Sequence, residues 1–183
     1  MTIEHLERLY NNGHRNIAYI GGYRSVSDEN GAVLHNSDDV RNVTYKKWMK
    51  DNHLEEFSKV YLEGWSALDG MKATENLLTD FKGQILPTAL IVGSDPIAVG
   101  AYRALKKNGL MIPKNISVVS FDNIEVAEYL TPSLSTINVH TEELGKIAVR
   151  LVDERIKSIR EVPIQVTVAS NVIVRESEKS LNK

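Results

Sequence analysis

The sequence predicts an α/β protein: a parallel sheet with helices on both faces. Four short apolar runs rich in β-branched residues recur along the chain, and helix-length segments separate them. This spacing is typical of βαβ units. The runs are nearly continuous in apolar residues, as expected for strands covered on both faces. The segments between them carry recognisable helix start and stop signals.

The expected strands come in a regular order. A first helix stops at Gly13, because glycine is favoured just past a helix end. The strands themselves are residues 16–22, 59–64, 88–95 and 116–123.

Two helix starts can be read from single residues. In the helix that runs towards Gly109, Asp95 is expected as the N-cap, and Pro96 occupies a position where no backbone N–H is needed. Ser66 and Asp69 have the spacing of a capping box, with Asp in place of the usual Glu or Gln.

Two further helices are predicted from apolar spacing. Residues 141–156 combine an acidic first turn with apolar side chains at helical intervals. A second helix, near residues 39–52, is expected to place four side chains near one face: Val40, Val43, Trp48 and Met49.

The remaining segments are less regular. Residues 23–37 are polar and are expected to form a long surface loop. Residues 163–177 are interpreted as two short strands with a turn near Ser170, followed by a frayed tail.

Composition excludes several classes of protein. Of 183 residues, 42% are hydrophobic, which is enough for a core, and the formal net charge is only −2. Scattered charges give no footprint for nucleic acid or an acidic membrane surface. Without cysteine, disulfides and thiolate zinc sites are excluded. With no apolar stretch near the roughly 20 residues of a membrane span, we expect a cytoplasmic protein with no membrane partner.

Candidate ligand contacts follow the expected strands. In an open parallel sheet, ligands bind beyond the carboxyl ends of the strands. A tryptophan, hydroxyls, carboxylates and a nearby arginine converge on that edge. This composition suits a neutral sugar, because carboxylates bond hydroxyls and an aromatic ring stacks on the apolar face of the sugar.

Structural roles compete with this interpretation. Asp95 and Ser66 are better explained as helix caps than as ligand contacts, whereas for Asp122 the two roles are balanced. Trp65 is either a stacking platform or core packing. Five histidines without a paired spacing make a histidine metal site unexpected, and no phosphate loop or nucleophile elbow occurs. No cofactor or catalytic residue is predicted.

Several runs, in this order, resemble one family. They are "GHRNIAYIGG", "DDVRNVTYKKWM", "GWSALDG", "PTALIVGSDPIAVGAYRALKKNGLMIPKNISVVSFDN", "PSLSTINV" and "EELGKIAVRLV". Together they look like the effector-binding core of LacI/GalR bacterial transcription regulators, and "EGWSALDG" is especially similar to the lactose repressor branch. The resemblance implies a periplasmic-binding-protein-like type I fold.

The resemblance also implies roles for individual residues. Arg41 corresponds to an arginine that bonds effector hydroxyls, and Trp65 to a tryptophan that stacks on the sugar. Ser37, Ser94 and Asp122 correspond to further effector contacts.

Departures from the family pattern leave the effector open. They are Thr44 in place of Gly, Ser94 in place of Asn, and Val139 near a position that is often polar.

The resemblance implies a dimer and a partial second lobe. Ala98, Val99 and Tyr102 resemble the family's dimer contact, so a homodimer is expected. Residues 16–134 would form a complete C-terminal lobe, while 1–15 and 135–183 would be returning pieces of a partial N-terminal lobe. The DNA-binding helix-turn-helix is absent, so operator DNA would be contacted only through a missing domain.

The leading hypothesis is the ligand-sensing and dimerisation domain of a sugar-responsive repressor, not an enzyme. A galactoside or related sugar would shift the lobes and lower operator affinity. The alternative is a secreted sugar-binding protein that serves a transporter, and a glycoside-active enzyme is a weaker third.

Overall fold

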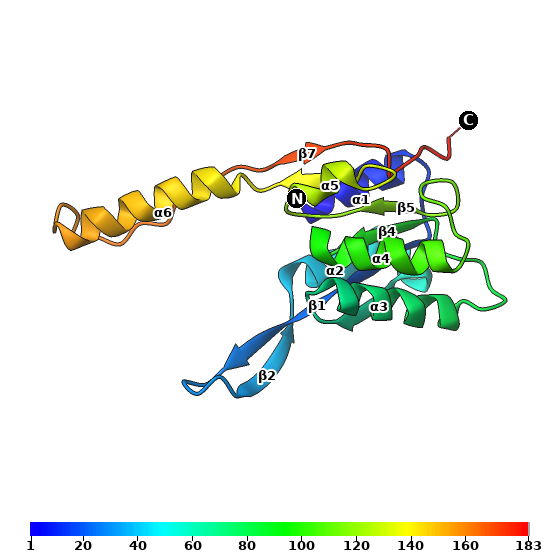
Figure 1. Ribbon diagram of the computed structural model, residues 1–183, viewed down its shortest axis with the longest axis horizontal. Helices are drawn as coiled ribbons and strands as arrows, with labels where there is room; N and C mark the ends of the chain where they lie inside the picture. Colours follow the sequence, from blue (N-terminus) through cyan, green and yellow to red (C-terminus); the bar gives the residue numbers. More distant parts are fainter. Residues whose placement is uncertain (183) are drawn as a thin grey trace.

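A computed structural model describes residues 1–182 as a sheet-centred body with two projecting arms (Figure 1). One arm is the hairpin of β1 and β2, and the other contains α6. Both project from the same side of the body. The elements are α1 (Thr2–Asn11), β1 (Ile17–Ser27), β2 (Val33–Asp38), α2 (Val40–Asp51), a 3-10 turn (Glu55–Phe57), β3 (Lys59–Glu63), α3 (Ala67–Asp80), β4 (Ala89–Val92), α4 (Asp95–Lys107), β5 (Ser117–Val119), α5 (Val126–Tyr129), β6 (Thr136–Asn138), α6 (Thr141–Ile156) and β7 (Asn171–Ile173).

Four parallel strands form the sheet of the body. The first half of β1 lies between β3 and β4, and β5 pairs with the other side of β4. At the centre, Ile20 faces Tyr61 on one neighbour and Val92 on the other. The four predicted strands are therefore confirmed as β1, β3, β4 and β5, and so is the α/β class.

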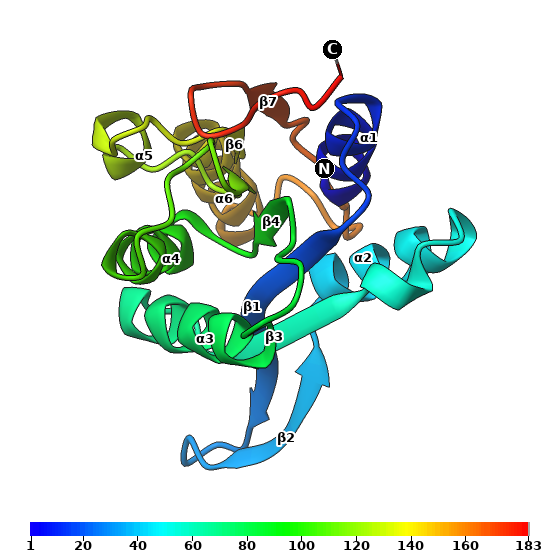
Figure 2. The same ribbon diagram turned by 90° about the vertical axis from the view of Figure 1, so that its right-hand side faces the viewer.

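Helices cover both faces of this sheet (Figure 2). Along β1, Ala18 and Ile20 belong to a buried cluster shared with α3 and α4. Ile17 and Tyr19 belong to the opposite cluster, which they share with α1 and α2. Because successive side chains of a strand point to opposite faces, a near-continuous apolar run is what two covered faces require.

Helices α3 and α4 touch along their backbones. A Cβ added at Gly100 would collide with the carbonyl oxygen of Ala67, and one added at Gly70 would collide with that of Ile97. Glycine at these two positions is what allows the close approach.

The predicted capping box is confirmed, whereas the predicted cap at Asp95 is wrong. The Ser66 hydroxyl accepts from the Asp69 backbone N–H, and the Asp69 carboxylate accepts from that of Ser66. In α4 the N-cap is Ser94, and Asp95 is the first helical residue, ahead of Pro96. The Asp95 side chain is fully buried and bonds other elements instead of its own helix.

The face predicted for α2 is wrong at two of its four residues, Val40 and Val43. Val40 is 72% exposed and Val43 is 49% exposed. The buried residues are Asn42, Tyr45 and Met49, and Trp48 packs partly buried against the same cluster, so Met49 and Trp48 were placed correctly. Tyr45 decides the orientation, because its hydroxyl donates to the Ile17 carbonyl at the start of β1 (2.7 Å).

The long loop predicted over residues 23–37 is instead an antiparallel hairpin. The outer half of β1 pairs with β2 from Tyr23–Asp38 to Ser27–Val33. The turn is stabilised by the Asp28 side chain, which accepts from the Asn30 and Ala32 backbone N–H groups. Polar side chains concealed this hairpin, since both strands are exposed and have no apolar face to recognise.

The second arm consists of α6 and the segment that returns along it (Figure 1). The predicted helix over 141–156 is confirmed as α6, but none of its residues is buried. Of the two strands predicted near residues 163–177, only β7 is present, and its partner is β6. Residues 157–170 form no strand.

The tail after β7 is not frayed as predicted. Ser177 is fully buried, and its carbonyl accepts from the Val118 backbone N–H (2.8 Å). The Leu181 N–H donates to the Asn12 carbonyl (2.7 Å). Both ends of the chain therefore lie against the body: α1 through the cluster under β1, and the tail beside β5. The division into two lobes stays a prediction.

Candidate ligand-binding site

The first turn of α2 holds an arginine in a fixed position at the carboxyl edge of the sheet. Asp39 is the N-cap and accepts from the Arg41 backbone N–H (3.0 Å). The same carboxylate accepts from Arg41 Nε (2.6 Å) and from Nη2 (3.2 Å). Arg41 Nη1 donates to the Gly93 carbonyl at the end of β4 (2.6 Å). A bidentate ion pair with Asp39 and a hydrogen bond to a backbone carbonyl therefore fix the guanidinium group of Arg41.

Electrostatics agree with this arrangement. Burial acts to raise the pKa of the Asp39 carboxyl, but hydrogen bonds and charge from Arg41 outweigh it and lower that pKa below its usual range. The pair is thus fully ionised at neutral pH. Sequence reasoning missed Asp39, although an aspartate directly before a helix with an arginine two residues later is a usable signal.

Trp65 lies beside this arginine. The Arg41 guanidinium carbon is 4.6 Å from the centroid of the Trp65 ring, within the range of a cation–π contact. The indole N–H donates to the Tyr23 carbonyl (2.8 Å). A Cβ at Gly22 would come within 2.6 Å of Trp65 Nε1, so glycine there makes room for the ring.

Core packing, one of the two roles considered for Trp65, is confirmed, and the stacking role stays a prediction. It packs against the cluster beneath α3 and α4, and it remains only partly buried at the edge of the sheet. Because Arg41 lies over the ring, a sugar stacked on Trp65 would have to share that surface with the guanidinium.

The two residues that follow Gly93 have different roles. The hydroxyl of Ser94 has no hydrogen-bond partner in the described chain, whereas the carboxylate of Asp95 bonds the loop after β5. Ser94 is 6% exposed, and its hydroxyl has no hydrogen-bond partner among the residues that the structure describes. The Asp95 carboxylate accepts from the Ile124 N–H (2.9 Å) and the Thr136 hydroxyl (2.8 Å). Asp95 therefore braces the loop after β5, and burial raises the pKa of its carboxyl.

Asp122 lies on that braced loop. Its φ of 110° is unusual for a residue with a side chain, and its N–H donates to the Ile137 carbonyl (2.9 Å). It does not cap α5, which begins four residues later, so that alternative is wrong. Burial first, and then the charge of Asp95, raise the pKa of Asp122 to about 6, although Arg41 opposes the shift.

Two aromatic residues of the site were not predicted. The Tyr19 hydroxyl is buried and has no partner within the described part of the chain. It lies beneath the site, because a Cβ at Gly93 would be 3.0 Å from it. The Phe121 ring lies 5.7 Å from the Arg41 guanidinium and makes an edge contact with His5. Both belong to strand-like apolar runs, which gave no functional signal.

The structure therefore brings four of the five predicted effector residues to one edge. Arg41 contacts Trp65, bonds the carbonyl of the residue before Ser94, and exerts its charge on Asp122. Ser37 lies apart on β2, where its hydroxyl donates to the Arg24 carbonyl (3.3 Å). Hydroxyl, carboxylate, guanidinium and indole groups at one edge can bind a polyhydroxylated molecule.

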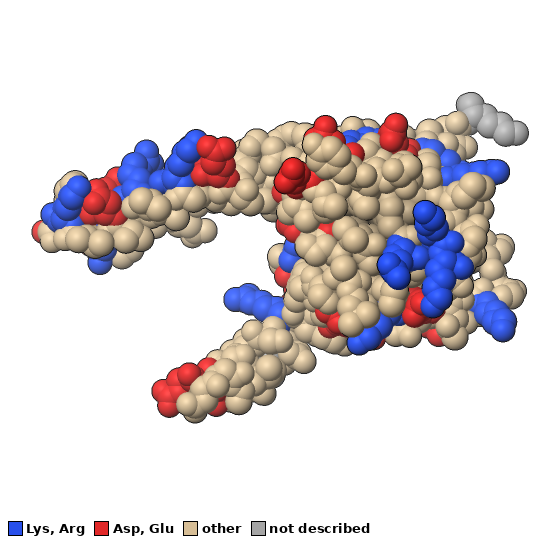
Figure 3. Space-filling view, viewed as in Figure 1, with Lys and Arg blue, Asp and Glu red and all other residues tan. Residues whose placement is uncertain are grey.

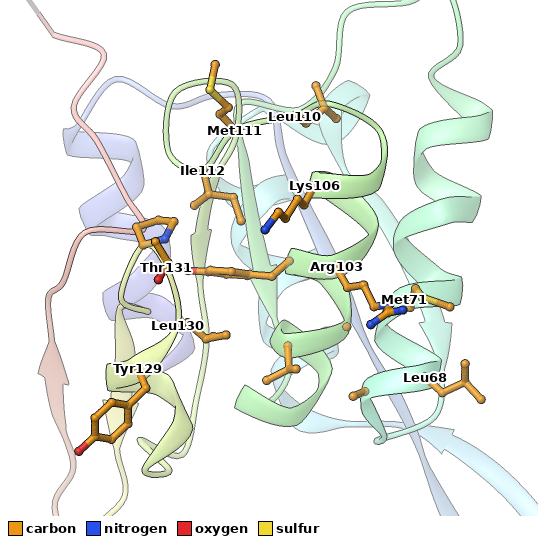
Figure 4. Close-up of a pocket in the computed structure, with 15 residues that line it drawn as sticks. Leu68, Met71, Arg103, Lys106, Leu110, Met111, Ile112, Tyr129, Leu130 and Thr131 are labelled. Atoms are coloured by element: carbon orange, nitrogen blue, oxygen red, sulfur yellow. The ribbon is translucent and has the colours of Figure 1, made fainter.

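The residues predicted for a dimer contact lie on α4, which begins directly after Ser94. Ala98 is fully buried in the body's own core. Val99 and Tyr102 line a pocket of about 1040 Å³ between α3, α4 and the segment around α5, together with Arg103, Lys106 and Tyr129 (Figure 4). None of the five predicted effector residues lines this pocket.

The described part of the chain offers neither a metal cluster nor a membrane-spanning helix. Within residues 1–182, no group of three or more His, Asp or Glu side chains is placed to hold a metal ion. No helix of the described chain has the length and apolarity needed to cross a membrane.

The fold and the candidate site together are those of an α/β domain of periplasmic-binding-protein type. The model of the periplasmic binding protein-like domain matches residues 6–178. The chain belongs to this family, and its relatives are LacI/GalR-type transcriptional regulators.

Relatives and solved structures agree with this assignment. The regulator GanR of Bacillus subtilis is 32% identical over 178 residues, which is 97% of this chain and 52% of that protein. The lactose operon repressor of Rhizobium radiobacter is 41% identical over 96 residues, covering 52% of this chain and 84% of the relative. A dimeric Lac repressor structure superposes with a TM-score of 0.81 at 26% identity, over 98% of this chain and 61% of that one. This chain spans about half the length of most of the curated relatives that it matches.

Proposed function

We propose that this chain is the ligand-sensing core of a sugar-responsive transcription repressor. The observation that carries the proposal is the placement of Arg41. It is fixed by Asp39 and the Gly93 carbonyl, and it lies over Trp65 at the carboxyl edge of a parallel sheet. This is where ligands bind in open α/β sheets.

The effector in this proposal is a galactoside or related sugar. A Lac repressor structure with 26% identity to this chain is bound to ONPG, and this chain covers 49% of it. The free hydroxyl of Ser94 and the carboxylate of Asp122 would bond sugar hydroxyls, while Trp65 offers its ring. The protein would act as a sensor rather than as an enzyme.

The remaining parts of the proposal concern the whole protein. Effector binding would shift two lobes relative to each other and lower operator affinity, which requires that the sugar bind the two arrangements differently. Operator contacts would belong to the part of the relatives that this chain does not cover. The protein would be a cytoplasmic homodimer, with Val99 and Tyr102 at the dimer contact.

The packing of the two chain ends supports a change in which residues we assign to each lobe. Leu6 and Leu9 of α1 lie in the cluster under β1, and Ser177 bonds β5. We therefore assign α1 and residues 174–182 to the same lobe as the sheet. The arm from about residue 139 to β7 then remains as the piece that reaches the other lobe.

Isothermal titration with lactose, melibiose, galactose, glucose and ribose tests the proposal. We expect at least one of these sugars to bind, with operator release when the protein is bound to DNA. Absence of binding to all five would contradict the sensor role.

A further inference from the structure

The loop that carries Asp122 has an unfavourable backbone conformation. Asp122 has a φ of 110° and Asn123 a φ of 56°, so two consecutive residues with side chains lie at positive φ. Positive φ is uncommon for residues other than glycine. Residues in sparsely populated backbone regions persist where the surrounding structure determines them, and they cluster at ligand clamps and switch regions. The groups that hold this loop therefore decide where Asp122 lies.

The loop begins at the candidate ligand-binding site. The residue before it, Phe121, has its ring 5.7 Å from the Arg41 guanidinium. The Phe121 carbonyl accepts from the N–H of Asp95 (2.9 Å), the first helical residue of α4, which directly follows Ser94. Asp122 therefore follows a residue that lies near the arginine and bonds the start of α4, so a change in the loop changes the site.

The backbone of the loop is bonded from β6. The Asp122 N–H donates to the Ile137 carbonyl (2.9 Å). The Asn123 N–H donates to the Thr136 hydroxyl (3.3 Å). Both acceptors lie on the strand that leads from the body into the α6 arm. These bonds hold the backbone and leave the side chain of Asn123 for another partner.

The partner of the Asn123 side chain is Arg175. Arg175 is the second residue after β7, where the chain returns from the α6 arm to the body. Its Nη2 donates to the side-chain oxygen of Asn123 (2.9 Å), and its Nη1 donates to the Leu134 carbonyl (2.9 Å). Its backbone N–H donates to the Ser135 hydroxyl (2.8 Å).

The planar guanidinium group suits this position. It carries several N–H donors in a fixed geometry, so one side chain can bond two acceptors on different segments. Arg175 thus connects the returning chain, the segment before β6 and the loop after β5. Both segments that join the α6 arm to the body are therefore bonded to the loop that carries Asp122.

We propose that Arg175 is a positioning residue for the effector. Through Asn123, it holds the loop after β5 in the conformation that places Asp122 at the site. Because Arg175 follows β7, a shift of the α6 arm changes the bond to Asn123 and with it the fit of Asp122 to the sugar. The inference rests on the proposed sugar-sensing function and names a residue that regulates its site.

The test is a double-mutant cycle read out by sugar affinity. Lactose, melibiose, galactose, glucose and ribose are titrated into the protein, and the one that binds best is then titrated into Arg175→Ala, Asn123→Gly and the double variant. Glycine at position 123 removes the side-chain oxygen and still adopts a φ of 56°. Asn123→Asp is the conservative variant, because it keeps an acceptor oxygen for the guanidinium group.

Glu176→Ala is the matched control. Glu176 is the next residue of the returning chain, and its carboxylate accepts from the backbone N–H and the hydroxyl of Ser133 (3.1 Å each). These two bonds connect the same chain to the segment before β6 rather than to the loop after β5. Circular dichroism shows which variants are folded. If Arg175→Ala does not fold, Asn123→Gly against Asn123→Asp makes the same comparison.

We expect Arg175→Ala to bind the sugar about tenfold more weakly, which is the effect of about one lost hydrogen bond. Asn123→Gly should lose a similar amount. The double variant should lose no more than Arg175→Ala alone, because the two residues act through one contact. Asn123→Asp and Glu176→Ala should stay within about twofold of the parent. Hydrogen exchange at the amides of residues 122–124 should be faster in Arg175→Ala and unchanged in Glu176→Ala.

Four outcomes overturn the inference. Unchanged affinity in a folded Arg175→Ala variant removes the positioning role and leaves the sensor role standing. Losses that multiply in the double variant show that Arg175 does not act through Asn123. An equal loss in Glu176→Ala assigns the effect to anchoring of the returning chain. Absence of binding of all five sugars to the parent removes the proposed function and the inference together.

Discussion

The body and the α6 arm differ in how far the apolar side chains of their helices are buried. In the body, the apolar side chains of α4 are covered: Ile97, Ala98 and Leu105 are fully buried. In α6, apolar side chains recur at helical spacing, yet Val149 is 71% exposed and Ile156 is 76% exposed. An amphipathic helix normally buries its apolar stripe. The body completes its own core, whereas the arm leaves a face uncovered.

The arm also differs from the body in its exposed charged residues. On the exposed side of α6, acidic and basic residues alternate, as Figure 3 shows along the arm. They include three i,i+4 ion pairs, and two of these, Lys146–Glu142 and Lys157–Asp153, join exposed side chains. Such pairs contribute little to stability. Stability is therefore concentrated in the body, and the candidate ligand site lies where the β1–β2 hairpin leaves the body.

The largest effect is expected from a matched pair of glycine substitutions. Gly100→Ala forces a Cβ into the backbone of α3, so the free energy of unfolding should fall by about 3 kcal/mol or more. Gly145→Ala on α6 meets no atom within 4 Å, and should raise helix stability by about 0.5–1 kcal/mol. Urea unfolding and circular dichroism measure both. Equal losses in the two variants would contradict the division into body and arm.

A smaller effect is expected at the junction of the body and the β1–β2 hairpin. Arg41→Ala leaves the Gly93 carbonyl without the guanidinium donor and the Asp39 carboxylate with only the backbone N–H of residue 41, so we expect a loss of about 2 kcal/mol in unfolding free energy. Sugar affinity should fall by about a hundredfold. Arg41→Lys is the control, because lysine keeps the positive charge but cannot form the bidentate contact of a guanidinium group. Lower stability with unchanged affinity would make Arg41 purely structural.

The pH dependence of Asp122 should be smaller still. Its pKa in the folded protein is raised to about 6, so the protonated form favours the folded state. Its contribution is therefore fully present below about pH 4 and is lost as the pH rises through 6. Relative to the parent, Asp122→Asn should gain about 1 kcal/mol of stability between pH 4 and 7, after allowing for solvent screening at a half-exposed group. Urea midpoints at both pH values measure this difference, and a pH-independent difference would refute the shift.

The smallest effect is expected on the arm. Val149→Ser removes an apolar side chain that covers nothing within the described residues, so the unfolding free energy should change by less than about 0.5 kcal/mol. Leu105→Ala in α4, which is fully buried, should cost about 2–5 kcal/mol in the same measurement. A large loss from Val149→Ser would mean that α6 packs against something in solution.

Features that depend on residues close together in the sequence could be predicted from the sequence. The four strands and the Ser66 capping box follow from apolar runs and from residues three apart. The hairpin was missed because its strands are polar and exposed on both faces. The role of Asp95 was missed because its partners lie far along the chain, at Ile124 and Thr136.

The same limit applies to the site. The resemblance to LacI/GalR regulators pointed to Arg41 and Trp65, but their mutual contact depends on tertiary packing. The bond from Arg41 to Gly93 spans 52 residues of sequence. Arg41 therefore has a structural role in addition to the effector contact that the resemblance implies.

The affinity of a bound sugar for the Trp65→Ala variant tests the central claim most directly. If Arg41 and Trp65 form the floor of a sugar site, the sugar that binds the parent best should bind this variant about tenfold or more weakly, while the variant stays folded. Unchanged affinity in a folded Trp65→Ala variant would show that the sugar lies elsewhere.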